Sequence, residues 1–366
     1  MKINTNRDEL LGPLLKVGNV VERRQTLPIL ANMLISAASG RLQFTATDLE
    51  VELTTSACAE ADGDIEFTLP ARKLIEICRA LPKGASMTLE IEGDKATLRS
   101  GYSRFTIGML PAQDYPTIDP ATASEQLNFP ESILKRLIDK TAFAMAHQDV
   151  RYYLNGLLLE ITTNRVRAVA TDGHRLALCD AELDTGVGSD IQIILPRKAV
   201  LELGRLLNDD DGALQLEISN SHARVRFGNT IFTTKLIDGR FPNYERVMPS
   251  GDTQRLLADC DSLRQSLIRT SILSNEKYRG IRFRLVPKLL HLHAHNSEQD
   301  EAKEELEIDY QGNEIIVGFN VGYLLDVLNV LDTKQVSMSL IDSSSSALMT
   351  PAGSMDCRYV VMPMRL

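Results

Sequence analysis

The chain has 366 residues, of which 43% are hydrophobic and 24% are charged, and its formal net charge is −9. These values are typical of a globular protein with two or three domains, and no apolar run reaches the roughly 18 residues that span a bilayer. The N-terminus MKINTNRDELL lacks a signal-peptide hydrophobic segment, and the negative net charge taken alone argues against nucleic-acid binding.

The cysteines indicate a reducing compartment. They are odd in number, scattered and without a C-x-x-C pair: Cys58, Cys78, Cys179, Cys260 and Cys357. We therefore expect a cytoplasmic protein with reduced thiols, no disulfide framework and no zinc site.

Two helix patterns occur three times along the chain. The first opens each copy and is predicted over residues 7–20, 131–146 and 261–273. The second is predicted in the segments LPARKLIEICRALP, LPRKAVLELGRLLN and FNVGYLLDVLNVLD, which begin at Leu69, Leu195 and Phe319. Apolar residues recur at spacings of three and four in these segments, which is typical of a helix with one buried face.

Short strands with alternating apolar residues account for much of the rest. The alternation covers residues 42–46, 166–170 and 290–294, and each copy ends on a strand with an aromatic residue, which is Phe105, Phe232 or Tyr359. Asp48 and Asp172 each follow a threonine at equivalent strand ends 124 residues apart, and Asn296 lies another 124 residues on. Such spacing indicates an internal repeat, so the Thr-Asp pairs are interpreted first as scaffold.

The fold class follows from this repeat. We predict an α+β protein of three structurally repeated domains, each with two helices and antiparallel sheets. The segments LPAQDYP and DGRFPNY are interpreted as linkers. The predicted domains are residues 1–120, 121–250 and 251–366.

The charge is unevenly distributed between the predicted elements. The six helical stretches with their flanks carry a net charge of +8. Because the whole chain carries −9, the rest of the chain carries −17. Basic helices attract phosphates, whereas acidic strands and loops repel them. The alternative is that lysine and arginine simply favour helices.

Several motifs closely resemble one family. They are TATDLEVEL, LPARK, HQDVRYYLNG, ATDGHRLAL, DGRFPNYERV, LSNEKYRG and YVVMPMRL, and together they cover the whole chain. They resemble the bacterial DNA polymerase sliding clamp, the beta subunit of the replicative polymerase. The resemblance implies a homodimeric ring of six similar domains, with helices lining a central hole and sheets forming the outer wall.

A function follows from the resemblance. Such a ring is a processivity factor that encircles duplex DNA without reading its sequence and tethers DNA polymerases, the clamp loader and repair factors through short linear peptides. No membrane partner is implied. The alternative function is a repeat scaffold that binds proteins without encircling DNA.

The resemblance also implies a peptide-binding pocket between domains 2 and 3. Its residues come from a strand end, the segment after copy two and the chain's terminus: Arg151, Leu154, Thr171, Gly173, His174, Arg175, Leu176, Pro242, Arg246, Val247, Ser346, Val360, Met362, Pro363 and Met364. Proline supplies stiff walls, methionine adapts to different guests, and Arg175 and Arg246 are expected at the rim. The alternative is that Val360 and Met362 are ordinary inward residues of a last strand. Ser344 is polar at a position that the resemblance assigns to an apolar residue.

DNA contacts are implied at a second set of residues, which are Arg24, Arg72, Gln148, Tyr152, Tyr153, Arg197 and Lys198. Contacts of a sliding ring should be few and directed at phosphates. For the two tyrosines the alternative is that one ring belongs to the core and only the other is exposed.

The ring implies a seam between the first domain of one chain and the third domain of the next. The residues implied are Lys73, Ile77, Leu81, Arg104 and Phe105 on one side, and Ile272, Leu273, Glu301 and Glu304 on the other. The acidic stretch SEQDEAKEELEID suits a basic partner face, and the alternative is a solvated loop.

Catalytic and metal-binding interpretations are weaker. Asp172 and His174 suggest an acid–base pair, and His291, His293 and His295 have the spacing of metal ligands on one strand face. The sequence contains neither a G-x-S-x-G motif nor a Walker A motif, and neighbouring strand-end residues point apart. We therefore expect no catalysis, no metal and no cofactor, with His174 as a contact residue in a segment that the other two copies lack.

Overall fold

The computed structural model describes residues 1–21, 27–38, 40–118, 123–249 and 253–365. Contacts divide the chain into two compact units, each described here by itself. The first unit is Met1–Ser132 with Leu201–Leu236, and the second is Ile133–Val200 with Ile237–Leu366. Within the described ranges, no helix combines the length and apolar character needed to cross a membrane.

The first unit contains an antiparallel sheet of eight strands, in the order β10-β15-β16-β17-β4-β3-β2-β6. The strands are β2 (Asn32–Ala38), β3 (Arg41–Thr47), β4 (Val51–Cys58), β6 (Ile65–Pro70), β10 (Glu125–Pro130), β15 (Ala213–Ile218), β16 (His222–Phe227) and β17 (Thr230–Lys235). The pairing of β17 with β4, from Thr230 opposite Thr55 to Thr234 opposite Val51, joins the last strand of copy two to copy one.

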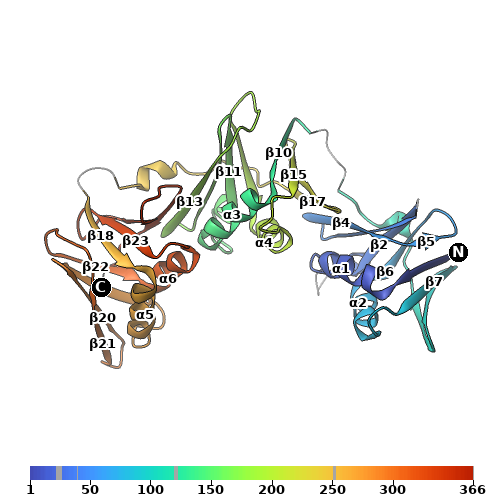
Figure 1. Cartoon of the computed structure of the whole chain (residues 1–366), viewed down its shortest axis with the longest axis horizontal. Coiled ribbons are helices and arrows are strands. Elements are labelled where there is room, and N and C mark those ends of the chain that lie inside the picture. Colours follow the sequence, from blue (N-terminus) through green and yellow to red (C-terminus); the bar gives the residue numbers. More distant parts are fainter. Residues whose placement is uncertain (22–26, 39, 119–122, 250–252, 366) are drawn as a thin grey trace. The chain divides into compact units, whose positions relative to one another are not determined.

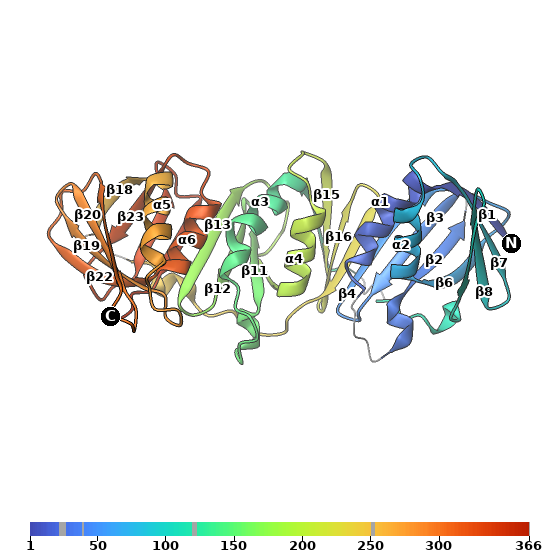
Figure 2. The ribbon, with the colours of Figure 1, turned by 90° about the horizontal axis from the view of Figure 1, so that it is seen from below.

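A second sheet in this unit has the order β5-β1-β7-β8-β9. Its strands are β1 (Lys2–Asn6), β5 (Glu60–Ala61), β7 (Ser86–Glu92), β8 (Lys95–Ser100) and β9 (Ser103–Gly108). Helices α1 (Arg7–Gly18) and α2 (Ala71–Ala80) lie side by side in Figure 2, and their apolar faces are buried. The Asn6 side chain caps α1 by accepting from the amides of Asp8 and Glu9. Two short 3-10 helices, η1 (Pro28–Ala31) and η2 (Ala112–Asp114), complete the unit.

The second unit repeats this construction. Its eight-stranded sheet has the order β14-β11-β12-β13-β25-β24-β23-β18. The strands are β11 (Gly156–Thr162), β12 (Arg165–Thr171), β13 (Arg175–Glu182), β14 (Ile191–Pro196), β18 (Gln254–Asp259), β23 (Gln335–Leu340), β24 (Ala347–Pro351) and β25 (Cys357–Val361). Here β13 of copy two pairs with β25 of copy three, from Arg175 opposite Val361 to Cys179 opposite Cys357.

A four-stranded sheet in the order β21-β20-β19-β22 completes the second unit. It contains β19 (Gly280–Val286), β20 (Leu289–His295), β21 (Glu301–Glu307) and β22 (Ile315–Asn320), and α5 (Cys260–Ser271) and α6 (Val321–Val330) pack beside each other (Figure 1). The remaining elements are α3 (Glu131–Thr141), α4 (Arg197–Leu206), η3 (Ala142–Ala144), η4 (Tyr152–Leu154) and η5 (Tyr244–Val247). The chain passes between the units within α3, within α4 and after Leu236.

The predicted repeat elements are confirmed. Helices form at both predicted positions of every copy, and the strands with aromatic residues near their starts are β9, β17 and β25. The helix predicted over residues 131–146 ends earlier, at Thr141, and a short 3-10 turn follows. The Thr141 hydroxyl donates to the Leu137 carbonyl at 2.5 Å, so the side chain bonds back into the last turn where the backbone leaves helical geometry.

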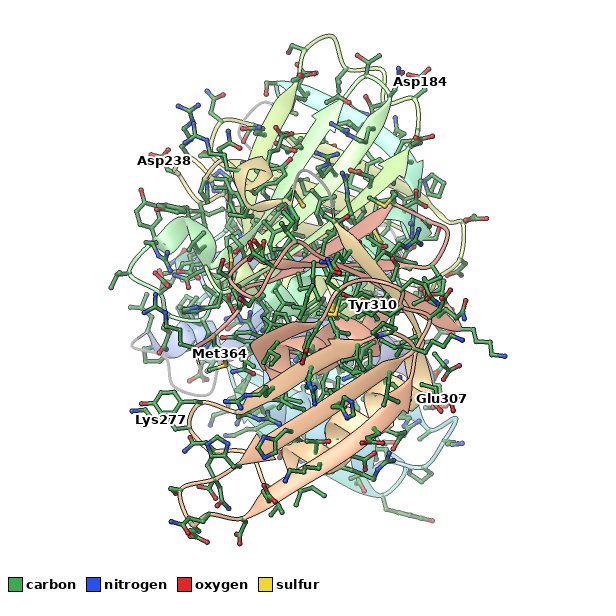
Figure 3. The ribbon with its side chains drawn as sticks, turned by 90° about the vertical axis from the view of Figure 1, so that its left-hand side faces the viewer. Asp184, Asp238, Lys277, Glu307, Tyr310 and Met364 are labelled. Carbon is green, nitrogen blue, oxygen red and sulfur yellow. A yellow bond between two sulfur atoms is a disulfide. The ribbon has the colours of Figure 1, made fainter. Side chains whose placement is uncertain are left out.

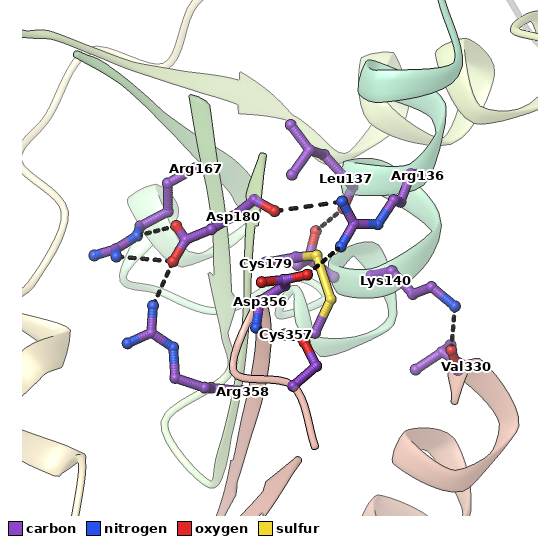
Figure 4. Close-up of a disulfide and its surroundings, with 12 residues drawn as sticks. Arg136, Leu137, Lys140, Arg167, Cys179, Asp180, Val330, Asp356, Cys357 and Arg358 are labelled. Atoms are coloured by element: carbon purple, nitrogen blue, oxygen red, sulfur yellow. Dashed lines mark hydrogen bonds and ion pairs between the residues drawn. A yellow bond between two sulfur atoms is a disulfide. The ribbon is translucent and has the colours of Figure 1, made fainter. Parts of the chain in front are cut away.

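The expectation that all cysteines are free thiols is wrong for one pair. Cys179 and Cys357 form a disulfide between β13 and β25, with Cα atoms 4.1 Å apart, as Figure 4 shows. The two residues are direct partners across an antiparallel ladder, a position in which side chains meet. Their separation of 178 residues concealed this contact in the sequence. Cys58, Cys78 and Cys260 are free.

An ion cluster lies on the same two strands. The Asp180 carboxylate accepts from Arg167 Nε at 2.5 Å and Nη2 at 3.0 Å, and from Arg358 Nη2 at 2.5 Å (Figure 4). Arg167 also donates to the Tyr244 hydroxyl at 3.1 Å. Burial, followed by the hydrogen bond to Glu160, raises the pKa of Tyr244 to about 12. This cluster connects β12, β13, β25 and η5, so it stabilises the joint between copies two and three.

Removing the Asp180 carboxylate should leave two poorly solvated guanidinium groups, those of Arg167 and Arg358, without their carboxylate partner. We expect Asp180→Ala to lower the free energy of unfolding by about 3 kcal/mol, measured by urea titration. Asp190→Ala, at an exposed position in the same unit, is the control and should change stability by less than about 0.5 kcal/mol. Equal stability of the two variants would contradict the structural role of the cluster.

Candidate functional site

The turn between β12 and β13 is held by the side chains of its Thr-Asp pair. The Asp172 carboxylate accepts from the amides of His174 at 2.9 Å and Arg175 at 3.0 Å. The Thr171 hydroxyl donates to the Arg175 carbonyl at 2.6 Å and accepts from the Gly173 amide at 3.1 Å. The Asp172 carboxylate is therefore occupied by backbone donors.

Copy one builds its turn in the same way. The Asp48 carboxylate accepts from the amides of Glu50 at 2.9 Å and Val51 at 2.7 Å. The Thr47 hydroxyl donates to the Val51 carbonyl at 2.8 Å and accepts from the Leu49 amide at 3.0 Å. The scaffold interpretation of the Thr-Asp pairs is therefore confirmed, and it disfavours an acid–base role for the aspartate of copy two.

Arg175 does not lie free at a rim. Its guanidinium contacts the carboxylates of Asp172 and Asp326, donates to the Phe143 carbonyl at 2.8 Å, and lies 4.6 Å from the ring centroid of Tyr323. Its side chain is only 13% exposed, so it fastens β13 to α6. Arg175, which was expected at the rim, is therefore largely buried, and each of its polar directions already has a partner in the chain.

His174 lies beside this arginine and is exposed. Its ring stacks on Tyr323, with centroids 6.4 Å apart and planes 17° from parallel. The His174 carbonyl accepts from the Met362 amide at 2.9 Å, which holds the terminal segment against the turn. An aromatic wall of His174 and Tyr323 therefore borders the terminal methionines.

Arg151 is positioned by a compact loop before η4. It donates to Asp149 from Nε at 3.0 Å and from Nη2 at 2.8 Å, and these bonds lower the pKa of the Asp149 carboxyl to about 2. Gly173, with φ of +89°, passes so close that an added Cβ would lie 3.0 Å from Arg151 Nη2. Glycine adopts this conformation without strain, and a larger residue would displace the Arg151 side chain, although Leu49 has a similar φ of +78° in the equivalent turn of copy one.

The two tyrosines after this loop differ in exposure. Tyr152 is 57% exposed, whereas Tyr153 packs partly buried against the core, and the rings meet edge to face with centroids 5.8 Å apart. The alternative that only one ring is exposed is therefore confirmed. Gln148 is exposed and has φ of +56°, and the neighbouring Val150 is 95% exposed.

A buried apolar cluster forms the floor below the turn. Leu154, Leu176 and Val360 belong to it, and Val247 packs partly buried against it. Val360 is fully buried, which agrees with the alternative that it is an inward-facing residue of the last strand. Such residues shape the surface above them, and only exposed neighbours meet a partner directly.

The remaining candidate residues lie nearer the surface. Pro242 and Arg246 are exposed, and Met362, Pro363 and Met364 are half-buried. The Met364 amide donates to the Gly318 carbonyl at 2.8 Å, so the terminal segment is held on both sides.

A serine-rich loop reaches the same region. The Asp342 carboxylate accepts from the amides of Ser344 and Ser345, both at 2.8 Å. Hydrogen bonds to these two serines lower the pKa of the Asp342 carboxyl to about 2. Ser344 is turned toward Asp342, to which its hydroxyl also donates. The Ser346 hydroxyl donates to the Val247 carbonyl at 3.1 Å, which joins the loop to η5.

The other basic residues expected at DNA are distributed over several elements. Arg72 is exposed on α2 of the first unit, and Arg197 and Lys198 begin α4, with Arg197 Nη1 donating to the Met145 carbonyl at 3.1 Å. Lys198 is half-buried and already has an interaction within the chain. Arg24 lies outside the described residues.

The acidic stretch after β20 is not a solvated loop, because residues 301–307 of it form strand β21. Glu304 accepts from Arg269 Nε at 2.6 Å and Nη2 at 2.8 Å, and these bonds lower the pKa of its carboxyl. Glu301 pairs with Lys303 and with His293. The glutamates expected at the seam therefore already have partners in the chain.

The expected seam residues flank two sheet edges. Ile272, just after α5, is 74% exposed, and Leu273 is half-buried. In the first unit Lys73 and Arg104 are exposed. Ile77 and Phe105 are half-buried, and Leu81 is buried.

Two histidines of β20 contact glutamates of β21. His291 lies 3.1 Å from Glu305 and His293 lies 3.2 Å from Glu301, while Leu290 of the same strand faces the core. In the part of the chain that the structure describes, no group of three His, Cys, Asp or Glu side chains is arranged to hold a metal ion.

Sequence reasoning missed Tyr323, Asp326 and Phe143, which surround Arg175. A signal was present for Tyr323, which occupies the position that Lys73 takes in the first helix of this type. The second helix has Ala199 at this position, so only the third helix carries an aromatic ring there. Phe143 lies within η3, after the end of the predicted helix, and no pattern distinguished it.

Comparisons with known proteins agree over the whole chain. Models of the DNA polymerase III beta subunit match with its N-terminal domain at residues 1–119, its central domain at 128–243 and its C-terminal domain at 245–365. The beta sliding clamps of Pseudomonas putida and Escherichia coli K12 are 49% and 46% identical, each over 100% of both chains.

Solved structures agree as well. The DNA polymerase III subunit beta from Pseudomonas aeruginosa superposes with a TM-score of 0.97 at 48% identity, over 100% of both chains. A sliding clamp from Bartonella birtlesii, solved bound to griselimycin, gives 0.97 at 36% identity, also over 100% of both chains. With matches of this extent in every comparison, the chain belongs to the DNA polymerase III beta subunit family, the bacterial sliding clamps.

Proposed function

We propose that this chain acts in the cytoplasm as a head-to-tail homodimeric ring around duplex DNA, with domains at residues 1–120, 121–250 and 251–366. The ring has no chemistry of its own and tethers DNA polymerases, the clamp loader and repair factors through the site around His174. The observation that supports the proposal most strongly is the pattern of strand pairing between successive copies.

Each joint follows one rule. The last strand of a copy pairs with a fixed strand of the preceding copy, as β17 does with β4 and β25 with β13. Two strands in these positions have no such partner among the described strands. They are β9, the last strand of copy one, and β21, which is the strand of copy three that corresponds to β4 and β13. Each is the edge of its sheet, with one strand neighbour among the described residues. A second chain supplies the missing partner at each edge, and two chains close the ring.

Charge supports the same pairing. Arg104 on β9 and Arg99 on β8 are basic, whereas Glu301, Glu305 and Glu307 on β21 are exposed and acidic. Exposed ion pairs contribute at most about 1 kcal/mol each, so they orient the two chains. Backbone hydrogen bonds and burial of Ile272 provide most of the stability.

The seam is tested by removing its apolar contacts. Ile272→Ala with Leu273→Ala should convert the dimer to monomers in analytical ultracentrifugation, because burying such side chains contributes about 1.5–3 kcal/mol each. Ile316→Ala truncates an exposed isoleucine on β22, at the opposite edge of the same sheet, and should leave the dimer intact. A dimer that persists in the double variant would argue against this seam.

Contact with DNA is expected to be weak and electrostatic. The basic side chains Arg72, Arg197 and Lys198 suit phosphates, and a closed ring is retained by topology, so tight binding is unnecessary. Tyr152 and Gln148 add exposed polar and aromatic surface.

Retention on DNA tests the ring directly. After loading by the clamp loader of the same organism, the protein should co-elute with nicked circular DNA in gel filtration and should leave once the circle is cut. The Ile272→Ala, Leu273→Ala variant should not be retained, because an open ring has no topological link. Continued binding after cutting would instead favour the protein-only scaffold or a conventional DNA-binding protein.

The partner site combines a rigid wall with adaptable side chains. Tyr323 and Arg175 hold the wall in place, while Met362 and Val247 offer apolar surface to a short peptide. Pro242 stiffens the border opposite the turn.

Tyr323 gives a specific test of this site. Tyr323→Ala removes the ring that supports both His174 and Arg175, and it should weaken binding of a labelled peptide from the replicative polymerase by about tenfold or more. Fluorescence anisotropy measures the affinity, and ultracentrifugation checks that the dimer persists. Tyr323→Phe keeps the ring and should bind like the original chain. Equal affinity of the alanine variant would exclude the wall from the site.

A further inference from the structure

A cavity of about 380 Å³ opens beside the terminal segment in the second unit. Its basic lining comes from Arg282, His293, His295 and Arg365, and Tyr278 and Met364 form its less polar walls. The lining contains no aspartate or glutamate, although the whole chain has a net charge of −9. A concentration of basic groups in an acidic protein points to an anionic ligand.

The basic groups are brought together by strand register. Arg282 on β19 lies directly opposite His293 on β20, and the rings of His293 and His295 lie 5.8 Å apart. Within the described ranges, the side chains of Arg282 and Arg365 have no hydrogen-bond or ion-pair partner. By contrast Arg284, two residues along the same strand, is paired with Glu314 at 2.6 Å. The two guanidinium groups at the cavity are therefore available to a ligand.

The cavity is continuous with the proposed partner site. Met364 lines the cavity and belongs to the terminal segment that follows β25 and borders His174. Its amide bond to Gly318 holds this segment beside the four-stranded sheet. In Figure 3 Met364 and Lys277, the neighbour of Tyr278, lie at the same end of this sheet, and Glu307 lies at the other end. A peptide that crosses the terminal methionines therefore reaches the cavity within a few residues.

We propose that this cavity binds an acidic side chain that flanks the partner's peptide segment, on the side that leaves across Met364. The inference rests on the proposed partner site and extends it with a preference for charge. A carboxylate accepts two parallel hydrogen bonds from one guanidinium group, and Arg282 and Arg365 each supply such a group.

The surroundings favour a single carboxylate over a nucleic acid. The chain just beyond His295 is acidic, with Glu298, Asp300 and Glu301. Of these, Asp300 is bonded to Asn296 of the cavity lining, and Glu301 lies 3.2 Å from His293. A duplex carries a phosphate charge about every 1.7 Å, so it would meet these carboxylates as well as the cavity. One acidic side chain enters without this repulsion.

The experiment uses the dimeric protein and three labelled peptides from the replicative polymerase. One contains only the clamp-binding segment, one extends it at both ends with Asp-Glu, and one with Asn-Gln. The acidic extension should increase affinity about tenfold over the neutral one, and the increase should shrink at high salt. Arg282→Gln with Arg365→Gln should abolish the difference and leave binding of the unextended peptide unchanged. Arg284→Gln, the matched control, should preserve the difference.

Each outcome decides the inference. Equal binding of acidic and neutral extensions overturns it while the proposed function stands, whereas no binding of the unextended peptide overturns both. Loss of oligonucleotide affinity in the Arg282, Arg365 variant, without an effect on the acidic peptide, assigns the cavity to phosphates and also overturns it. Charge reversal adds positive evidence, because Arg282→Glu should reverse the preference toward a Lys-Lys extension.

Discussion

Pairing of strand edges between successive copies is the interaction on which the rest of the structure depends. An open sheet edge exposes unpaired amides and carbonyls, and such an edge must be covered or must find a partner. Within the chain this need is met twice, by β4 with β17 and by β13 with β25. Because the copies are equivalent, the same strands of copies one and three remain as edges, and their charges are opposite. These two edges are the ones that the proposed head-to-tail dimer would pair.

The same pairing also builds the proposed partner site. The turn at His174 begins β13, and the methionines of the terminus follow β25, so the ladder between these strands sets the distance between the two walls. The Cys179–Cys357 disulfide and the Asp180 ion cluster lie on this ladder, four to five residues from the turn. Arg175 then ties the ladder to α6 through Asp326 and Tyr323. The proposed partner site is therefore a preformed surface, and preformed surfaces require little ordering on binding.

Much of this fold was predictable from the sequence, because repetition gives three independent readings of one pattern. The Thr-Asp turns, the paired helices and the three strands near Phe105, Phe232 and Tyr359 all follow from spacing and periodicity. Contacts between copies were less accessible. Cys179 and Cys357 meet through a register that no local pattern reveals, and Arg175 resembled a rim residue because its partners Asp326 and Phe143 are distant in the sequence. Local patterns predict elements, whereas partners of individual side chains depend on how those elements assemble.

The division between scaffold and function therefore follows the repeat itself. Where the copies agree, as in the bonds of Thr47 and Thr171, the residues hold the backbone. Where the copies differ, as at Lys73, Ala199 and Tyr323 in the equivalent helices, the surfaces differ too. The cavity beside Met364 fits this rule, since Arg282 and His293 pair across strands of the third copy, whereas the equivalent pair in copy one, Leu34 and Thr45, is uncharged. Divergence within a repeated scaffold is thus a physical guide to sites, because the backbone there is already stabilised by features that all copies share.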